Sequence, residues 1–197
     1  MSSFSVIIDT QALVYLTRLG HTHDIWTILP NLFHEILVPI EIETEFIKGA
    51  NKEPERLALV DEIDRGLFIK KCTSYDSGTL LLLQSTPKVD AGEAEAAAQQ
   101  MSVNTDFIWS DDKPFRAAVE RLNPDIKIYN SLHIIALLDV HGFIENYPLL
   151  IKDLHLVRPI KQASFKHCYK EVCRHLGYKI SENEVHAKTD LKAMGII

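Results

Sequence analysis

Hydrophobic and polar positions along the chain follow two alternating patterns. Short, nearly continuous apolar runs such as SVII and FIW are typical of strands that are buried on both faces. The segments between these runs carry apolar residues three or four positions apart, as expected of helices with one buried face. We predict five strands, at residues 4–8, 35–38, 67–70, 107–110 and 126–128.

The segments between the predicted strands carry helix signals. Pro39 suits the first turn of a helix on which Ile42 and Phe46, four positions apart, face the core. Residues 73–88 are harder to interpret, because an apolar run at 80–83 lies between a loop and a proline. Strands that alternate with helices indicate a parallel sheet with helices on both faces. The predicted helices of this part begin near residues 9, 24, 39, 53, 90, 114 and 131.

The pattern beyond Tyr147 is helical only. Helices are predicted over residues 148–156 and about 163–176, followed by a tail. The chain is therefore expected to divide into an α/β domain, residues 1–147, and a helical C-terminal extension, residues 148–197.

Composition places the chain among ordinary globular proteins. It has 197 residues, of which 46% are hydrophobic and 24% are charged. No run of about 18 apolar residues occurs, and the first residues do not resemble a signal peptide, so no membrane association is expected. The three cysteines are too few and too scattered for a disulfide framework, which suits a reducing compartment. We expect a cytoplasmic protein.

Charge is distributed unevenly along the chain. Residues 1–112 carry 8 basic and 18 acidic residues, whereas residues 113–197 carry 13 basic and 9 acidic residues. The net charge of −6 alone argues against a nucleic-acid partner. An acidic centre beside a basic flank is nevertheless what a metal-dependent nuclease needs, with carboxylates for the metal and cations for phosphate.

Carboxylates follow the predicted strands or open the helices next to them. In an open parallel sheet, ligands bind beyond the carboxyl ends of the strands. Oxygen ligands of this kind suit Mg²⁺ or Mn²⁺, which can activate a water molecule and stabilise the leaving oxygen of a phosphodiester. The acids at these positions are Asp9, Glu45, Asp90, Glu93, Asp111 and Asp112.

Each of these acids also has a simpler explanation. Asp9 suits the N-cap position of a helix. Asp90 and Glu93 have the spacing of a capping box, and Asp111 and Asp112 suit a strand end followed by a first helical turn. Glu45 can be a solvated helix residue. A shared site is favoured because all of these positions lie at the edge of the predicted sheet where strands end and helices begin.

The chain resembles the PIN domain family, a metal-dependent nuclease fold that also occurs in bacterial and archaeal toxins. The matching segments run in the family's order, as VIIDTQALVYL, VPIEIETEF, VDAGEAEAAAQQ, IWSDDKPFRAAV and NSLHIIALLDVHGFI, and span residues 4–144. The resemblance implies a three-layer α/β/α sandwich around a parallel sheet of about five strands. It also implies that the metal-binding acids are Asp9, Glu45, Glu93 and Asp112, with Asp111 beside them.

These observations lead to a first hypothesis, a ribonuclease that depends on Mg²⁺ or Mn²⁺. Asp9, Glu45, Glu93 and Asp112 would be catalytic. Such a protein is a candidate toxin of a toxin–antitoxin pair, with a small antitoxin protein as inhibitor and a homodimeric state. The basic residues expected to approach RNA are Lys113, Arg116, Lys166, Lys170 and Arg174.

Two other hypotheses remain open. A PIN-like scaffold that binds RNA or protein without cutting would have the same fold. A hydrolase of small phosphate esters would use the same acids. Metal titration followed by incubation with RNA distinguishes the three.

Overall fold

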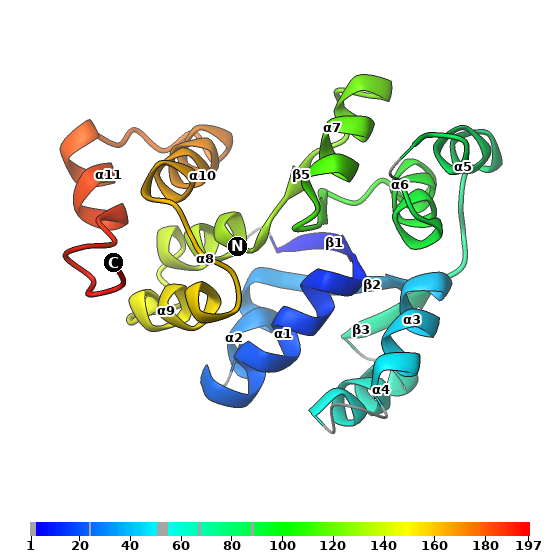
Figure 1. Ribbon diagram of the computed structural model, residues 1–197, viewed down its shortest axis with the longest axis horizontal. Coiled ribbons are helices and arrows are strands. Elements are labelled where there is room, and N and C mark those ends of the chain that lie inside the picture. Colours follow the sequence, from blue (N-terminus) through cyan, green and yellow to red (C-terminus); the bar gives the residue numbers. More distant parts are fainter. Residues whose placement is uncertain (1–2, 24, 51–54, 67, 88) are drawn as a thin grey trace. The chain divides into compact units, whose positions relative to one another are not determined.

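The computed structural model describes residues 3–23, 25–50, 55–66, 68–87 and 89–197. It divides into two compact units, Met1–Asn130 and Ser131–Ile197, each described below by itself. The first unit contains the strands and the helices between them (Figure 1). Its elements are β1 (Phe4–Ile8), α1 (Thr10–His23), α2 (Ile25–Leu32), β2 (Phe33–Pro39), α3 (Ile40–Ala50), α4 (Glu55–Arg65), β3 (Ile69–Cys72), α5 (Ser77–Gln84), α6 (Ala91–Val103), β4 (Phe107–Trp109), α7 (Lys113–Leu122) and β5 (Ile128–Tyr129).

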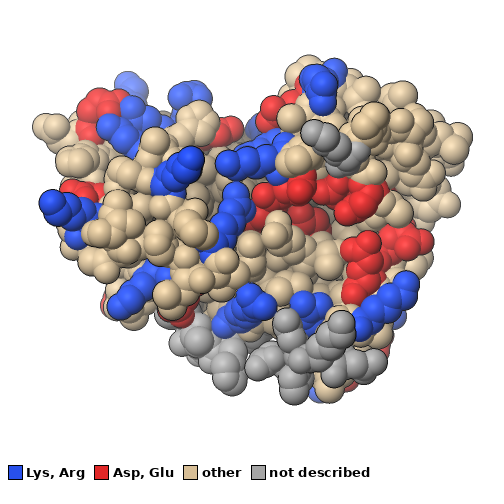
Figure 2. Space-filling view, in the orientation of Figure 1, with Lys and Arg blue, Asp and Glu red and all other residues tan. Residues whose placement is uncertain are grey.

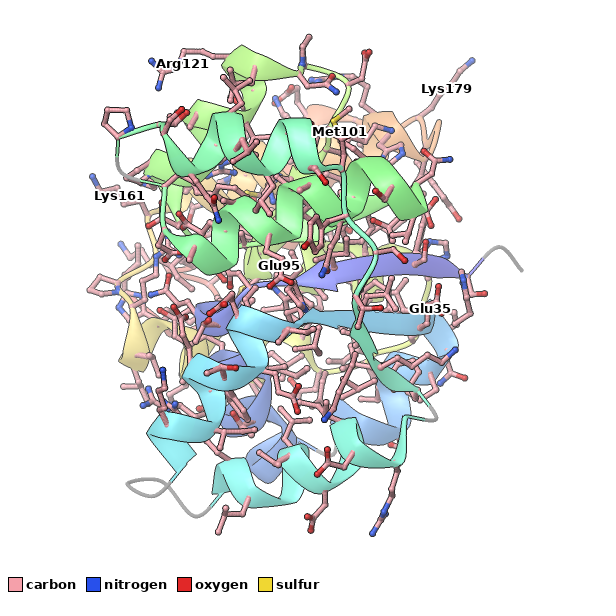
Figure 3. All side chains as sticks on the ribbon, turned by 90° about the vertical axis from the view of Figure 1, so that its right-hand side faces the viewer. Glu35, Glu95, Met101, Arg121, Lys161 and Lys179 are labelled. Carbon is pink, nitrogen blue, oxygen red and sulfur yellow. The ribbon has the colours of Figure 1, made fainter. Side chains whose placement is uncertain are left out.

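The five strands form one parallel sheet in the order β3-β2-β1-β4-β5. Helices α1 to α4 lie on one face of this sheet and α5 to α7 on the other, as Figures 1 and 3 show. Right-handed connections require this arrangement, because the chain first builds the sheet outward from β1 in one direction and then from β1 in the other. The predicted sandwich around a five-stranded parallel sheet is confirmed.

The middle of the sheet is the core of the first unit. All five residues of β1 are buried, as a central strand covered on both faces requires. Aromatic rings of the neighbouring strands pack together, with the Phe33 ring 6.0 Å from that of Phe107 and 6.3 Å from that of Trp109. The predicted core positions Ile42 and Phe46 of α3 are buried as well.

The hydrophobic pattern found all five strands, although β3 and β5 begin two residues later than predicted, and it missed two helices. The segment at residues 73–88 contains α5, and the predicted tail contains α11 (Glu182–Thr189). β2 begins at Phe33, two residues before the predicted strand at 35–38. The expected starts at residues 24, 53 and 67 lie outside the described residues.

The second unit consists of α8 (Ser131–Val140), α9 (Tyr147–Val157), α10 (Gln162–His175) and α11. The nearly buried carboxylate of Asp139 on α8 joins two of the others, accepting hydrogen bonds from the Tyr169 hydroxyl at 2.5 Å and from Lys188 Nζ at 2.9 Å. The Tyr147 hydroxyl donates to the carbonyl of Lys188 at 2.8 Å. The last helix is thus an integral part of this unit.

The boundary between the compact units falls after residue 130, whereas the predicted domain boundary falls after residue 147. Compactness does not define a domain in the family sense, so the division at 147 stays a prediction. None of the helices described here is long and apolar enough to cross a membrane.

Candidate active site

The candidate site lies where the order of the strands reverses. β1 pairs with β2 on one side and with β4 on the other, and the chain leaves β1 and β4 toward opposite faces of the sheet. Such a switch point opens a crevice beyond the carboxyl ends of the strands. The Asp9 backbone N–H donates to the Trp109 carbonyl at 3.0 Å. The segment after β1 therefore lies beside the segment after β4, as the nuclease hypothesis requires.

A cavity of about 320 Å³ opens at this edge of the sheet. Three of the four acids predicted to be catalytic line it, and a fourth acid, Asp90, joins them. Figure 2 shows acidic side chains gathered over the end of β1 and the starts of α6 and α7. The lining residues are Asp9, Thr10, Gln11, Ile42, Asp90, Glu93 and Asp112.

The helix-capping explanation of these acids is also correct. Asp9 Oδ1 accepts from the Ala12 N–H at 2.6 Å, and Asp112 Oδ1 accepts from the Phe115 N–H at 2.7 Å. Asp90 and Glu93 form the predicted capping box. Each cap occupies one carboxylate oxygen, so capping orients these side chains and leaves a second oxygen on each. Capping and metal binding are compatible here.

Ser110 connects two of the acids, and the sequence analysis missed it. Its side chain is fully buried; its hydroxyl hydrogen-bonds the Asp9 carboxylate and accepts from the Asp112 N–H at 3.1 Å. A serine that ends a strand carries no distinctive signal, since serine is common at such positions. Its position directly before the two acids was the only available clue.

The Asp9 carboxylate is held in an environment that disfavours its charge. Desolvation raises the pKa of Asp9 from 3.8 to about 7, against the hydrogen bonds from Ser110 and Ala12 that lower it. The negative charges of Asp111 and Asp112 raise the pKa further. A cation in the cavity would relieve this cost.

The environment of Glu93 also disfavours the charged form of its carboxylate. Desolvation raises the pKa of Glu93 from 4.5 to about 8, the hydrogen bond from the Asp90 backbone opposes the shift, and the charges of Asp90, Asp112 and Asp9 add to it. The mutual effect of Asp9, Glu93 and Asp112 shows that acids distant in the sequence act on one another. Perturbed carboxylates in a cleft are typical of functional sites.

Two further predicted metal ligands lie outside the cavity lining. Glu45 is exposed on α3, and its Oε2 accepts a hydrogen bond of 2.6 Å from the hydroxyl of Thr10. Thr10 itself lines the cavity, so Glu45 reaches the site through this hydroxyl. Asp111 is buried, is not among the lining residues, and acts on Asp9 through its charge. The metal-binding roles of Glu45 and Asp111 stay predictions.

The cavity has the right chemistry for a hard cation without a tight ligand cage. Its acids supply several carboxylate oxygens, and Mg²⁺ typically keeps most of its water and uses only one or two carboxylates. Among the residues that the structure describes, no three His, Cys, Asp or Glu side chains meet closely enough to hold an ion as they stand. The donor set thus fits an ion that is held partly through water.

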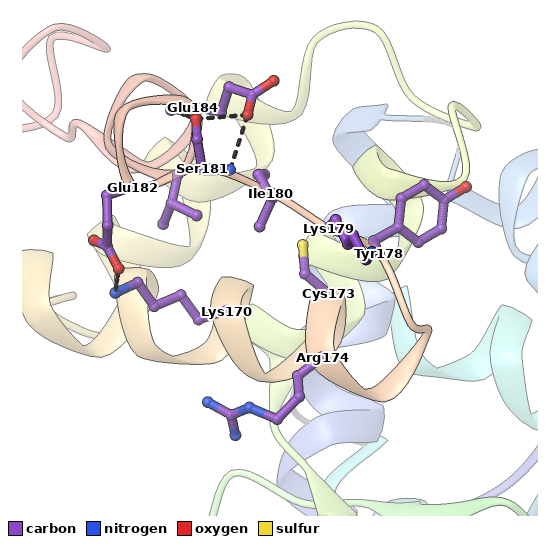
Figure 4. Close-up of a pocket in the computed structure, with 10 residues that line it drawn as sticks. Lys170, Cys173, Arg174, Tyr178, Lys179, Ile180, Ser181, Glu182 and Glu184 are labelled. Carbon is purple, nitrogen blue, oxygen red and sulfur yellow. Dashed lines mark hydrogen bonds and ion pairs between the residues drawn. The ribbon is translucent and has the colours of Figure 1, made fainter.

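The predicted RNA-binding residues occupy two places. Lys113 and Arg116 lie in the first turns of α7, directly after Asp112. Within the second unit, Lys166 and Lys170 both pair with Glu182, Lys166 at 3.2 Å. Lys170 and Arg174 line a separate cavity of about 720 Å³ in that unit, shown in Figure 4.

Comparison with protein families agrees with this geometry. A family model described as a PIN domain matches residues 5–159, which is most of the chain. The chain belongs to the PIN domain family, whose members generally have a nuclease fold and use divalent metal ions. The match confirms the resemblance on which the sequence analysis relied. Comparison with curated proteins finds no match.

Proposed function

We propose that this protein is a ribonuclease that depends on Mg²⁺ or Mn²⁺ and hydrolyses RNA phosphodiester bonds. The observation that carries the proposal is the convergence of Asp9, Glu93 and Asp112 on one cavity at the switch point of the sheet. Burial and mutual repulsion raise the pKa of Asp9 to about 7 and that of Glu93 to about 8. Such a group of acids is stabilised by a divalent cation and is costly without one.

In this proposal Asp9, Glu93 and Asp112 hold the ion, directly or through water. The ion would neutralise charge on the scissile phosphate and lower the pKa of a nearby water. Asp9 and Asp112 are kept in orientation by their backbone caps and by the Ser110 hydroxyl. Glu45 would act through Thr10, and Asp111 through its charge at Asp9.

The partners belong to the same proposal. Lys113 and Arg116 suit contact with the RNA backbone next to the acids, and the basic residues of α10 in the second unit are proposed to contact RNA as well. A small antitoxin protein and a second copy of the chain are proposed partners. Leu81 and Leu82 of the uncharged helix α5 are exposed, and exposed apolar surface of this kind is typical of protein contacts. Three free, buried cysteines agree with the proposed cytoplasmic location.

The test combines Mn²⁺ titration with incubation of mixed-sequence RNA. Wild type is expected to bind Mn²⁺ and to cleave RNA only when the ion is present. Asp9→Asn keeps the shape of the side chain and should lower cleavage at least about 100-fold. Glu120→Gln, on the exposed side of α7, is the matched control and should cleave normally. Wild-type cleavage by Asp9→Asn would show that the proposed mechanism is wrong.

A second candidate is a PIN module that binds RNA or protein without cleaving. The observation in its favour is that, in the described part of the chain, no three acidic side chains come close enough together to hold one metal ion. Mn²⁺ binding without RNA cleavage would support this candidate. Cleavage restricted to small phosphate esters would instead favour a small-molecule hydrolase.

A further inference from the structure

Helix α6 carries a second buried carboxylate that the proposed mechanism does not use. Glu95 follows Glu93 by two residues, is only 6% exposed, and is absent from the cavity lining. Positions two apart on a helix point in nearly opposite directions. Figure 3 shows Glu95 on α6, on the side facing the start of α3. A buried acid needs partners, and here they come from α3 as well as from α6 itself.

The partners of Glu95 lie at the first turn of α3 and, one turn further along α6, at Gln99, which in turn reaches the end of β3. Its Oε2 accepts the Glu41 N–H at 2.8 Å, and the Ile40 N–H also bonds to this carboxylate. Its Oε1 accepts from Gln99 Nε2 at 3.2 Å, and the same amide donates to the Cys72 carbonyl at 2.8 Å. Glu95 therefore serves as the cap of α3, supplied from another helix.

A second contact sits one helical turn earlier on α6. A Cβ atom at Gly92 would lie 2.9 Å from Ile42 Cγ1, which is closer than ordinary packing allows. The first turn of α3 therefore rests against α6 at Gly92 and is hydrogen-bonded to it at Glu95. These two contacts fix Ile42, which lines the cavity, and they fix the helix that carries Glu45.

We propose that Glu95 is a positioning residue for the active site. It holds the first turn of α3 against α6, so that Ile42 forms one wall of the cavity and Glu45 stands beside Thr10. Its role in the reaction rests on the proposed ribonuclease function, whereas its hold on α3 does not. Helix α6 thus supplies Glu93 to the cavity from one face. From another face it holds the first turn of α3, which contributes Ile42 to the cavity wall.

The test compares Glu95→Ala with Glu95→Gln. The alanine variant leaves the N–H groups of α3 without their acceptor. The glutamine variant keeps one oxygen to accept from the N–H groups of α3, while its amide takes the place of the oxygen that accepts from Gln99 Nε2. Ile63→Ala is the control, because it removes buried volume from α4 and the Ile63 side chain does not line the cavity.

Three measurements are made on the full chain. Amide hydrogen exchange at residues 40–42 should speed up by about tenfold or more in Glu95→Ala and by less than about threefold in Glu95→Gln and Ile63→Ala. The kcat for RNA cleavage at saturating Mn²⁺ should fall roughly 10- to 100-fold in Glu95→Ala, with KM nearly unchanged, and should recover in Glu95→Gln. Mn²⁺ affinity, measured by electron paramagnetic resonance, should stay within about threefold of wild type in all three.

Several outcomes would overturn the inference. Unchanged α3 exchange in Glu95→Ala would mean that Glu95 does not hold this helix. Faster exchange with an unchanged kcat would mean that α3 does not matter for the reaction. An equal loss of kcat in Ile63→Ala, or no recovery in Glu95→Gln, would reduce Glu95 to a general stability residue. If wild type cleaves no RNA, the proposed function fails, and the exchange data alone decide whether Glu95 holds α3.

Discussion

The acidic cavity of the first unit and the basic residues of α10 in the second unit both gather charge. In the cavity the charges repel one another, whereas at α10 they face a charge of opposite sign. In the cavity, like charges are crowded and desolvated, and the pKa values of Asp9 and Glu93 are raised. On α10, Lys166 and Lys170 meet the carboxylate of Glu182, and their hydrogen bonds lower the pKa of Glu182. In the first region the charges raise one another's pKa, whereas in the second lysine and glutamate charges partly offset one another.

The two regions differ in the free energy of their charged groups rather than in the number of charges. Buried carboxylates without a counter-ion cost free energy that folding elsewhere must supply. Exposed ion pairs contribute little in either direction. We therefore expect substitutions in the cavity to have large effects that depend on metal, and substitutions around Glu182 to have small effects that depend on salt.

The largest expected effect comes from Glu93→Gln. The substitution removes the charge, and Gln can still form the capping box with Asp90. RNA cleavage should fall at least about 100-fold, and Mn²⁺ should no longer raise the melting temperature. Cleavage assays and thermal melts with and without Mn²⁺ measure both, with Glu120→Gln as the control. A variant that Mn²⁺ stabilises as much as wild type would remove Glu93 from the metal site.

The next effect is on stability as a function of pH in the absence of metal. The pKa of Asp9 is about 7 in the folded chain against an ordinary value of 3.8, so between pH 4 and 7 the folded chain binds more protons than the unfolded chain. The free energy of unfolding contributed by this group therefore falls as pH rises through that window. Asp9→Asn should be more stable than wild type by about 1–3 kcal/mol at pH 8 and nearly equal to it at pH 4.

Urea unfolding in EDTA across this pH range measures the difference. Glu93 adds the same trend with a folded pKa of about 8. Mn²⁺ at pH 8 should reverse the order of stability, because only wild type gains from binding. If Asp9→Asn were less stable than wild type at pH 8 without metal, the buried charge of Asp9 would not destabilise the folded chain, and the prediction would be wrong.

A smaller effect is expected from Ser110→Ala. The substitution removes the hydroxyl that bonds Asp9 and accepts from the Asp112 N–H. Loss of a group that orients metal-binding residues should lower Mn²⁺ affinity about 10- to 100-fold and cost about 1 kcal/mol of stability. Isothermal titration with Mn²⁺ and urea unfolding measure the two quantities. Unchanged Mn²⁺ affinity would limit Ser110 to a structural role.

The smallest expected effect is that of Glu182→Gln. Exposed ion pairs are weak, so the urea midpoint of unfolding should not change measurably. RNA affinity should rise about two- to fivefold at low salt, because Lys166 and Lys170 no longer face a carboxylate. Glu184→Gln, in the same helical turn, keeps the capping box and serves as the control. Equal RNA affinity in both variants would show that α10 does not contact RNA.

Most of the fold could be predicted from local sequence patterns. The two helices that were not predicted have physical explanations. Buried strands such as β1 appear as continuous apolar runs, and the acids after them appear as caps. Helix α5 was missed because its apolar residues Leu80–Leu83 are consecutive, so they show no helical period, and two of them stay exposed. Helix α11 was missed because it is polar on most of its surface and is held by contacts such as that between Lys188 and Asp139.

The sequence by itself determined where the strands lie, that the sheet is parallel, and that acids stand at the ends of its strands, because these features depend on neighbouring residues along the chain. Only the tertiary structure decided which acids share a cavity. It linked Glu45 to the cavity through Thr10, kept Asp111 out of the lining, showed that Asp90 lines the cavity and that Ser110 joins two of the acids, and set Glu95 against α3. The physical reason is that desolvation and repulsion between distant carboxylates depend on strand order and helix packing, which no local pattern records.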